Sequence, residues 1–183
     1  MKETSHQTVT GKPHRILLYG NPLLRQVARK VTTINSDVLQ LLADLKTTML
    51  KNNGIGLAAN QIGVPLAVFT LAPQEADVDL PTTAIVNPQI IATEGTVENE
   101  EGCLSFPETF EVIPRPEMVI IKGITPEGKE TRIEASGLLA RAIVHEIEHL
   151  QGILFIDHIS ELRRKLLEQR LAAIEKLEKQ QCG

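Results

Sequence analysis

Two histidines four residues apart are the strongest chemical signal in the sequence. His145 and His149 bound the segment His-Glu-Ile-Glu-His. A helix places residues i and i+4 one turn apart on the same face, so both imidazoles can bind one metal ion. Glu146 follows the first histidine and is placed to act as a general base. Because an H-E-x-x-H segment also arises by chance in charged helices, a catalytic interpretation requires a third ligand.

Two residues are candidates for the third ligand once one familiar pattern is excluded. In the extended pattern H-E-x-x-H-x-x-G-x-x-H, Gly152 matches the glycine, but Phe155 occupies the position of the third histidine. A thermolysin-like protease uses a glutamate from a later helix instead, and Glu168 is the formal candidate. Cys103 is the better candidate, because the preceding Gly102 allows close approach of the backbone.

Cys103 and the two histidines would leave one coordination position open for water. An open position is typical of catalytic metal sites, whereas structural sites use four protein ligands. Three alternatives stay open at this point. Cys103 could be a small buried hydrophobic residue, it could form a cysteine–histidine nucleophile pair, or the metal could stabilise a binding protein without catalysis. Two histidines one helical turn apart suit a metal better than a nucleophile.

Length and composition indicate one cytoplasmic domain. A chain of 183 residues with 42% hydrophobic residues can bury a single core. The net charge of -4 argues against nucleic acid or an anionic membrane as the main partner. The polar first 13 residues and the short apolar runs predict neither export nor membrane insertion. Only two cysteines occur, and the second lies next to the C-terminus, so a reducing compartment is favoured.

Hydrophobic patterns predict an α+β fold. We expect a flexible N-terminal arm at residues 1–13 and a single catalytic domain at 14–183. Helices are predicted at 36–53, 137–151 and 160–181, and strands at 66–71, 84–91, 117–124 and 130–135. Ser36 is the expected N-cap of the first helix, and the last two strands should form a hairpin. The amphipathic helix at 160–181 has one apolar stripe and is expected to cover the sheet.

Three segments resemble motifs of the peptide deformylase family. Residues 54–61, Gly-Ile-Gly-Leu-Ala-Ala-Asn-Gln, match G-x-G-x-A-A-x-Q. Residues 101–105, Glu-Gly-Cys-Leu-Ser, match E-G-C-L-S, and residues 145–149 match H-E-x-x-H. The three motifs occur in the family's order and separation, and the resemblance covers about residues 16–159. It implies mixed, mainly antiparallel sheets packed around a central metal-binding helix, with a C-terminal amphipathic helix.

The resemblance implies a hydrolase that removes the N-formyl group from the formyl-methionine terminus of nascent proteins and releases formate. The metal ligands that it implies are Cys103, His145 and His149. Glu146 would move protons between water and the leaving amine. The side-chain amide of Gln61 and the backbone N–H of Leu104 would stabilise the oxyanion.

The resemblance also implies the residues that contact the peptide. These are Gly54, Ile55, Gly56, Glu101, Gly102, Arg115, Arg141 and Ala142. The first three would lie along the peptide backbone as it adds a strand to the sheet. Arg115 would lie close to the substrate, and the others would border the methionine side chain.

Fe²⁺ is the implied native metal, and Zn²⁺, Ni²⁺ and Co²⁺ are compatible with one thiolate and two imidazoles. The implied partners are formyl-methionyl nascent peptides, with association with ribosomes, and the expected state is a monomer. One departure from the family is Glu148, where the family usually has aspartate; the longer side chain could shift a contact behind the metal. His6, His14 and His158 match no ligand spacing and are expected to be solvent-facing or structural.

Overall fold

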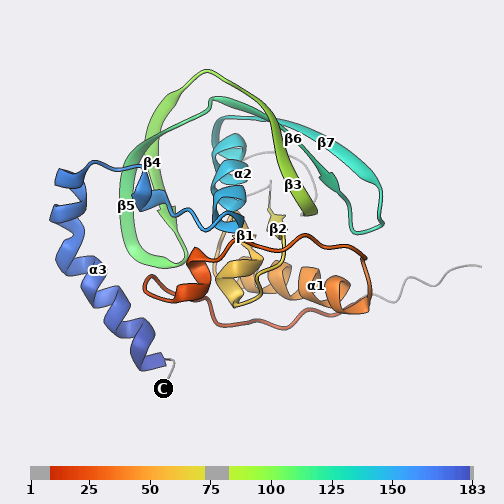
Figure 1. The fold of residues 1–183 in the computed structure, drawn as a ribbon, viewed down its shortest axis with the longest axis horizontal. Helices are drawn as coiled ribbons and strands as arrows, with labels where there is room; N and C mark the ends of the chain where they lie inside the picture. The colour runs from red at the N-terminus through yellow and green to blue at the C-terminus, as the bar shows by residue number, and fades with distance from the viewer. Residues whose placement is uncertain (1–8, 73–82, 182–183) are drawn as a thin grey trace, which may run out of the picture.

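The computed structural model describes residues 9–72 and 83–181, and Figure 1 shows how their elements are arranged. The helices are α1 Ser36–Lys51, α2 Gly137–Leu150 and α3 Glu161–Gln181, with short 3-10 helices η1 Pro22–Arg25, η2 Ala59–Ile62 and η4 Phe155–Asp157. The strands are β1 Gly56–Ala58, β2 Val68–Leu71, β3 Thr83–Glu94, β4 Val97–Cys103, β5 Phe106–Arg115, β6 Met118–Ile124 and β7 Glu130–Ser136. The predicted α+β class is confirmed.

The strands form two antiparallel sheets. Five strands pair in the order β1-β2-β3-β6-β7, and β4 pairs with β5 alone. The predicted hairpin of β6 and β7 is confirmed, with Met118 opposite Ser136 and Ile124 opposite Glu130. The hairpin of β4 and β5 was not predicted from the hydrophobic pattern, although it carries one of the expected metal ligands.

The central helix α2 lies between the two sheets, as the resemblance implied (Figure 1). Ala140 and Ile143 are fully buried on this helix and pack with Phe69, Val119 and Ile121 from the five-stranded sheet. Burial of these side chains fixes the rotation of α2 about its axis. The face with the two histidines therefore turns toward the end of β4.

Helix α1 begins at the expected residue but has a different cap. Ser36 is the first helical residue, and the N-cap is Asn35, whose side-chain oxygen accepts a hydrogen bond of 3.0 Å from the Val38 N–H. The prediction of Ser36 as N-cap is therefore wrong by one residue. The helix ends at Lys51, and Asn53 has a left-handed φ of 54° that turns the chain toward β1.

The expected covering of a sheet by α3 holds for the two-stranded sheet, where Leu171 joins Phe106 and Ile113 of β5 in one apolar cluster. Leu171 and Ile174 are buried, but Leu162 and Leu166 on the same stripe are exposed. Near its C-terminal end, the buried Glu178 accepts hydrogen bonds from the Arg15 side chain and the Leu18 N–H. Figure 1 shows α3 along one side of the molecule, away from the five-stranded sheet.

Part of the expected N-terminal arm lies against α1. The Lys12 N–H donates to Asp44 at 2.7 Å, and the Gln40 side chain donates to the Thr10 carbonyl at 3.0 Å. His14, expected to be solvent-facing or structural, bonds to Asp44 at 2.8 Å. Residues 1–8 of the arm, which include His6, lie outside the described residues.

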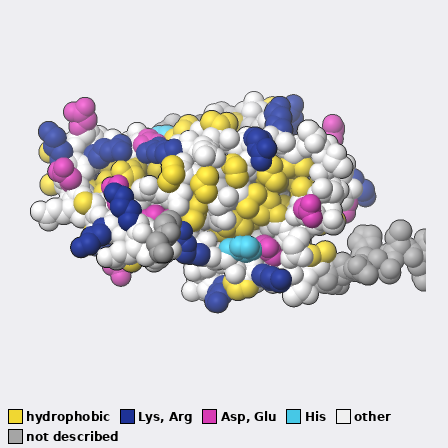
Figure 2. Space-filling model, turned by 60° about the horizontal axis from the view of Figure 1, so that its bottom comes forward, with side chains coloured by type: hydrophobic (Ala, Val, Ile, Leu, Met, Phe, Trp, Pro, Cys, Tyr) yellow, Lys and Arg dark blue, Asp and Glu magenta, His cyan; other side chains and the backbone are white. Residues whose placement is uncertain are grey.

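The molecular surface mixes apolar and charged side chains. Figure 2 shows a face with a hydrophobic area near its middle and Lys and Arg side chains spread around it. Within residues 9–72 and 83–181, no helix is both long and apolar enough to span a bilayer.

Candidate metal centre and active site

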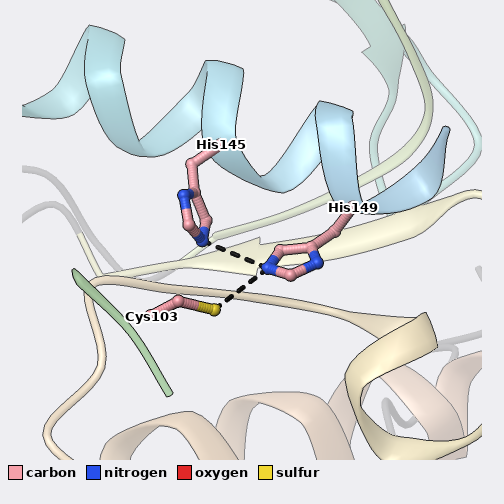
Figure 3. A group of neighbouring side chains, drawn as sticks. All are labelled: Cys103, His145 and His149. Atoms are coloured by element: carbon pink, nitrogen blue, oxygen red, sulfur yellow. Dashed lines mark hydrogen bonds between the residues drawn. The ribbon is translucent and has the colours of Figure 1, made fainter. Parts of the chain in front are cut away.

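Cys103, His145 and His149 come together at one point, the first from the end of β4 and the others from one face of α2 (Figure 3). Their ligand atoms all lie within 4.8 Å of one another. The two Nε2 atoms are 3.1 Å apart, and Cys103 Sγ is 3.2 Å from His149 Nε2. A tetrahedral zinc site with metal–nitrogen bonds of about 2.0–2.1 Å places two ligand nitrogens roughly 3.3 Å apart. The spacing therefore fits a single shared metal ion.

The turn between β4 and β5 positions Cys103. Leu104 and Ser105 form this two-residue turn, and Cys103 pairs with Phe106 across it. The Ser105 carbonyl accepts a hydrogen bond of 2.9 Å from the Tyr19 N–H. The buried Phe106 ring packs against Tyr19, with ring centres 5.1 Å apart. The ligand is therefore held by the protein core as well as by its strand.

Glu101 orients His145. Its Oε1 lies 2.6 Å from His145 Nδ1. An ionised carboxylate only accepts, so Nδ1 carries the proton and Nε2 keeps the lone pair that a metal needs. Burial alone would raise the pKa of Glu101, but hydrogen bonds from Arg115 and His145 hold that pKa well below its usual range. Glu101 therefore remains a carboxylate at neutral pH and fixes the ring.

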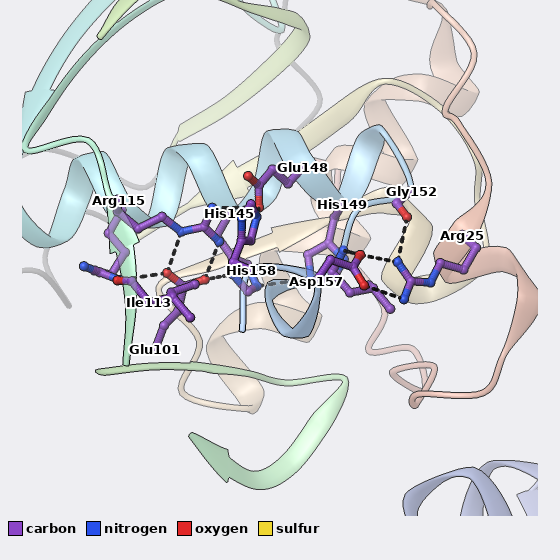
Figure 4. Close-up of polar contacts among 12 residues, drawn as sticks. Arg25, Glu101, Ile113, Arg115, His145, Glu148, His149, Gly152, Asp157 and His158 are labelled. Carbon is purple, nitrogen blue, oxygen red and sulfur yellow. Dashed lines mark hydrogen bonds and ion pairs between the residues drawn. The ribbon is translucent and has the colours of Figure 1, made fainter. Parts of the chain in front are cut away.

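Two buried arginines hold Glu101 in turn, and Figure 4 shows the contact of Arg115. Arg115 donates to both carboxylate oxygens, at 2.7 and 2.9 Å, and Arg141 donates at 3.0 Å. Arg141 also reaches the backbone carbonyls of Ile113 and Val97, at 3.3 and 3.2 Å. These bonds tie α2 to the hairpin of β4 and β5 across the metal centre. Sequence reasoning had placed Glu101 only beside the methionine pocket and missed this orienting contact.

The structure places Arg115 away from the substrate pocket. Its side chain is only 2% exposed and does not border the pocket. Beyond Glu101, it pairs with Glu148 at 2.7 Å, and Glu148 bonds to His158 at 2.9 Å. The longer side chain of Glu148, which stands in place of the usual aspartate, thus reaches the arginine that holds Glu101. The expected substrate contact of Arg115 is replaced by this indirect role, and His158 is structural.

His149 is held in the state that binds metals. Burial lowers the pKa of His149 well below its ordinary value, so its ring is neutral. At the end of α2, the Asn60 side chain donates to the His149 carbonyl at 3.0 Å and to the Gln26 carbonyl at 2.7 Å. Asn60 had no role assigned from the sequence. The structure shows that it ties η2 to the metal helix.

Glu146 lies beside the three ligands in a buried position. A Cβ atom at Gly56 would be 2.5 Å from Glu146 Oε1, so the close approach of β1 requires glycine there. Glu146 Oε2 is buried and makes no hydrogen bond with any residue in the described part of the chain. Burial raises the pKa of Glu146 to about 7. A carboxylate near this pKa is suited to exchange protons at neutral pH.

Gln61 presents a fixed amide to the same centre. Its side-chain oxygen accepts a hydrogen bond of 2.9 Å from the Ala58 N–H. The NH₂ group donates to Ser105 Oγ at 3.2 Å and to Cys103 Sγ at 3.5 Å. The bond to Ala58 sets which end of the amide faces the metal ligands. Gln61 is therefore preorganised as a donor that faces the ligand Cys103.

A pocket of about 620 Å³ opens onto the centre. The residues with predicted roles that border it are Gly54, Ile55, Gly56, Gln61, Glu101, Gly102, Cys103, Leu104, Arg141, Ala142, His145 and Glu146. Glu168, the ligand of the protease alternative, is exposed on α3 and borders a separate groove with Tyr19. The group of ligand atoms found among the described residues does not include it. The thermolysin-like arrangement is therefore wrong for this chain.

An open three-ligand centre beside a buried carboxylate is typical of metal-dependent hydrolases. The sequence matches the family model for polypeptide deformylase over residues 13–165. It is 42% identical to a peptide deformylase of Syntrophobacter fumaroxidans over 155 residues, which cover 85% of this chain and 91% of that protein. For a peptide deformylase of Thermodesulfovibrio yellowstonii, the identity is 45% over 154 residues, 83% of this chain and 92% of that protein.

Solved structures of the same family share the fold. A peptide deformylase from Legionella pneumophila superposes with a TM-score of 0.85 and 35% identity, covering 92% of this chain and 98% of that one. The peptide deformylase from Thermus thermophilus gives a TM-score of 0.83 and 35% identity, covering 90% and 99% of the two chains. This chain belongs to the polypeptide deformylase family and is an enzyme.

Proposed function

We propose that the chain removes the formyl group from the N-terminal formyl-methionine of nascent proteins, with Cys103, His145 and His149 as the ligands of one divalent metal ion. The observation that carries this proposal is the grouping of these three ligand atoms within 4.8 Å. They lie at a pocket that Glu146 and Gln61 also border. The relatives are named peptide deformylases, and this name indicates the reaction. The thiolate and two imidazoles support a metal-dependent mechanism for it.

When bound, the metal supplies a Lewis acid that polarises the formyl carbonyl and makes water more acidic. Glu146 takes a proton from the attacking water and later gives it to the leaving amine. The free Oε2 atom of this carboxylate suits both transfers. The Gln61 amide and the Leu104 backbone N–H donate to the oxygen on which negative charge develops.

Substrate selection follows from the walls of the pocket. Strand β1 is an edge strand of the five-stranded sheet, so its outer edge can pair with an extended peptide. Gly54, Ile55 and Gly56 border the pocket along this edge. Gly102, Arg141 and Ala142 border it where the methionine side chain is proposed to lie.

The proposal extends to the setting of the reaction. Residues 14–183 act as a single catalytic domain in the cytoplasm, and the enzyme works as a monomer on nascent chains at the ribosome. Fe²⁺ is the proposed native ion, because a donor set of one thiolate and two imidazoles accepts it together with Zn²⁺, Ni²⁺ and Co²⁺.

A comparison of two substrates tests this function. The enzyme should release formate from formyl-Met-Ala-Ser and leave its peptide bonds intact, as mass spectrometry of the products would show. Unformylated casein should remain uncut under the same conditions. Cleavage of casein without formate release from the peptide would replace the proposed deformylase with a protease.

The oxyanion role of Gln61 leads to a separate prediction. Gln61→Ala should reduce kcat by about 10²-fold, because one preorganised donor to the oxyanion is lost. The metal content should stay unchanged, since Gln61 is not a ligand, and KM should change much less than kcat. Gln61→Glu should be at least as harmful, because it brings negative charge toward a developing negative charge. Wild-type kcat in both variants would assign oxyanion stabilisation to the metal and Leu104 alone.

A further inference from the structure

Asn60 is a fully buried polar residue that precedes the proposed oxyanion donor Gln61 in the sequence. It does not border the active-site pocket, whereas Gln61 does. Both residues lie in the 3-10 helix η2. A 3-10 helix has about three residues per turn, so consecutive side chains point roughly 120° apart. While Gln61 faces the ligand Cys103, Asn60 is therefore directed to a different neighbour.

The side-chain NH₂ group of Asn60 joins η2 to the end of the metal helix. It donates to the backbone carbonyl of His149 at 3.0 Å and to that of Gln26 at 2.7 Å. Its Oδ1 atom makes no hydrogen bond with any residue that the structure describes. The donor end of the amide thus makes the side-chain hydrogen bonds of Asn60, and an apolar side chain would remove both.

The two carbonyls that Asn60 binds belong to segments that are joined to each other. The Ala28 N–H donates to the Leu150 carbonyl at 2.8 Å, so the chain after Gln26 lies beside the end of α2. The His149 carbonyl also accepts a bond of 3.1 Å from the Gly152 N–H. Asn60 is therefore anchored to the end of the helix that carries the ligand His149.

Other bonds of Gln61 orient its amide but do not join it to α2. Its side-chain oxygen accepts from the Ala58 N–H at 2.9 Å, and its backbone carbonyl accepts from the Leu17 N–H at 2.8 Å. The bond from Asn60 to the His149 carbonyl connects the residue next to Gln61 directly with a metal ligand. This bond can therefore set the distance between the Gln61 amide and the metal ligands.

We propose that Asn60 is a positioning residue that holds the Gln61 amide at a fixed distance from the metal ligand His149. The inference rests on the proposed deformylase function, in which the metal and the Gln61 donor act on the same oxygen atom. Misplacement of such a donor weakens binding of the transition state and leaves binding of the substrate nearly unchanged. Loss of the Asn60 bonds therefore lowers kcat, while KM and metal content stay close to wild type.

Two substitutions, Asn60→Ala and Asn60→Leu, test this role. Alanine leaves a space, whereas leucine has the same number and branching of non-hydrogen side-chain atoms, so the pair separates loss of the bonds from loss of packing. Each variant should reduce kcat for formyl-Met-Ala-Ser by about 10-fold, less than the loss of Gln61 itself. In amide NMR spectra of the Zn²⁺-loaded chain, the Gln61 side-chain signal should shift in both variants. Its absence from the spectrum of Gln61→Ala assigns this signal.

A double-mutant cycle separates positioning from a general structural role. In the Gln61→Ala background, Asn60→Leu should change kcat by about twofold or less, because the donor that Asn60 positions is already gone. Asn87→Ala is the matched control. The Asn87 side chain also bonds to the backbone of another segment, at 2.9 Å to the Val31 N–H and 2.8 Å to its carbonyl, and it does not border the pocket. This variant should lower the melting temperature but keep the wild-type kcat and the Gln61 amide signal.

Three results would contradict the role of Asn60 while leaving deformylation intact. They are wild-type kcat in folded Asn60→Leu, an equal fall in kcat with and without Gln61, and loss of metal together with loss of activity. The last result would assign the Asn60 bond to metal retention instead of to the donor. An absence of formate release from the wild-type chain would overturn the proposed function, and the positioning role with it.

Discussion

Replacing Glu146 with glutamine is expected to reduce formate release by about 10²- to 10⁴-fold, the usual contribution of a positioned general acid–base. Glutamine keeps the shape of the side chain but cannot take a proton from water or return one to the amine. Because Glu146 is not among the three ligands, the variant should still bind one metal ion per chain. Steady-state kinetics with a formyl-Met peptide, together with metal analysis, would measure both effects.

The stability of the Glu146→Gln variant provides the control. Oε2 of Glu146 has no hydrogen-bond partner in the described part of the chain, so the substitution breaks no internal bond of that atom. The melting temperature should therefore not fall. Turnover close to wild type in a folded, metal-loaded variant would exclude Glu146 as the proton carrier.

Replacing Cys103 with alanine should have the second large effect, because it removes one of three protein ligands. We expect the purified variant to contain almost no metal and to release formate only at background rate. Glu168→Ala is the matched control: its side chain is exposed on α3, so both metal content and activity should persist. Loss of metal in Glu168→Ala with retention in Cys103→Ala would restore the protease alternative.

Cys103→Asp should keep a metal ion but change its reactivity, since a carboxylate replaces a thiolate.

The elements with regular hydrophobic patterns were predictable from the sequence. The histidine spacing in α2 and the hairpin of β6 and β7 follow from helical periodicity and turn residues. The hairpin of β4 and β5 was missed because β5 carries charged side chains on its inner face and apolar side chains on its outer face. In β5, Glu111 and Arg115 face inward, while Phe110 and Val112 face solvent. Periodicity that assumes apolar residues inside cannot identify such a strand.

The site was predictable where residue type and spacing determine the chemistry. The two histidines are positioned by one helix, and the motif around Cys103 indicated the third ligand. The links among Glu101, Arg115 and Arg141 were not predictable, because they join residues 14 to 40 positions apart through tertiary structure. The resemblance implied that Arg115 lies close to the substrate. Its inward position, where it bonds to Glu101, depends on this network and could not be read from the sequence.

Metal reconstitution tests the central claim most directly. The chain would be purified without oxygen, stripped with a chelator and titrated with Fe²⁺, Zn²⁺, Ni²⁺ or Co²⁺, while formate release from formyl-Met-Ala-Ser is measured. We predict no activity in the stripped protein and a linear rise that ends at one metal ion per chain, with Fe²⁺ among the most active ions. Full activity in the stripped protein, or no formate release with any of the four ions bound, would contradict the account.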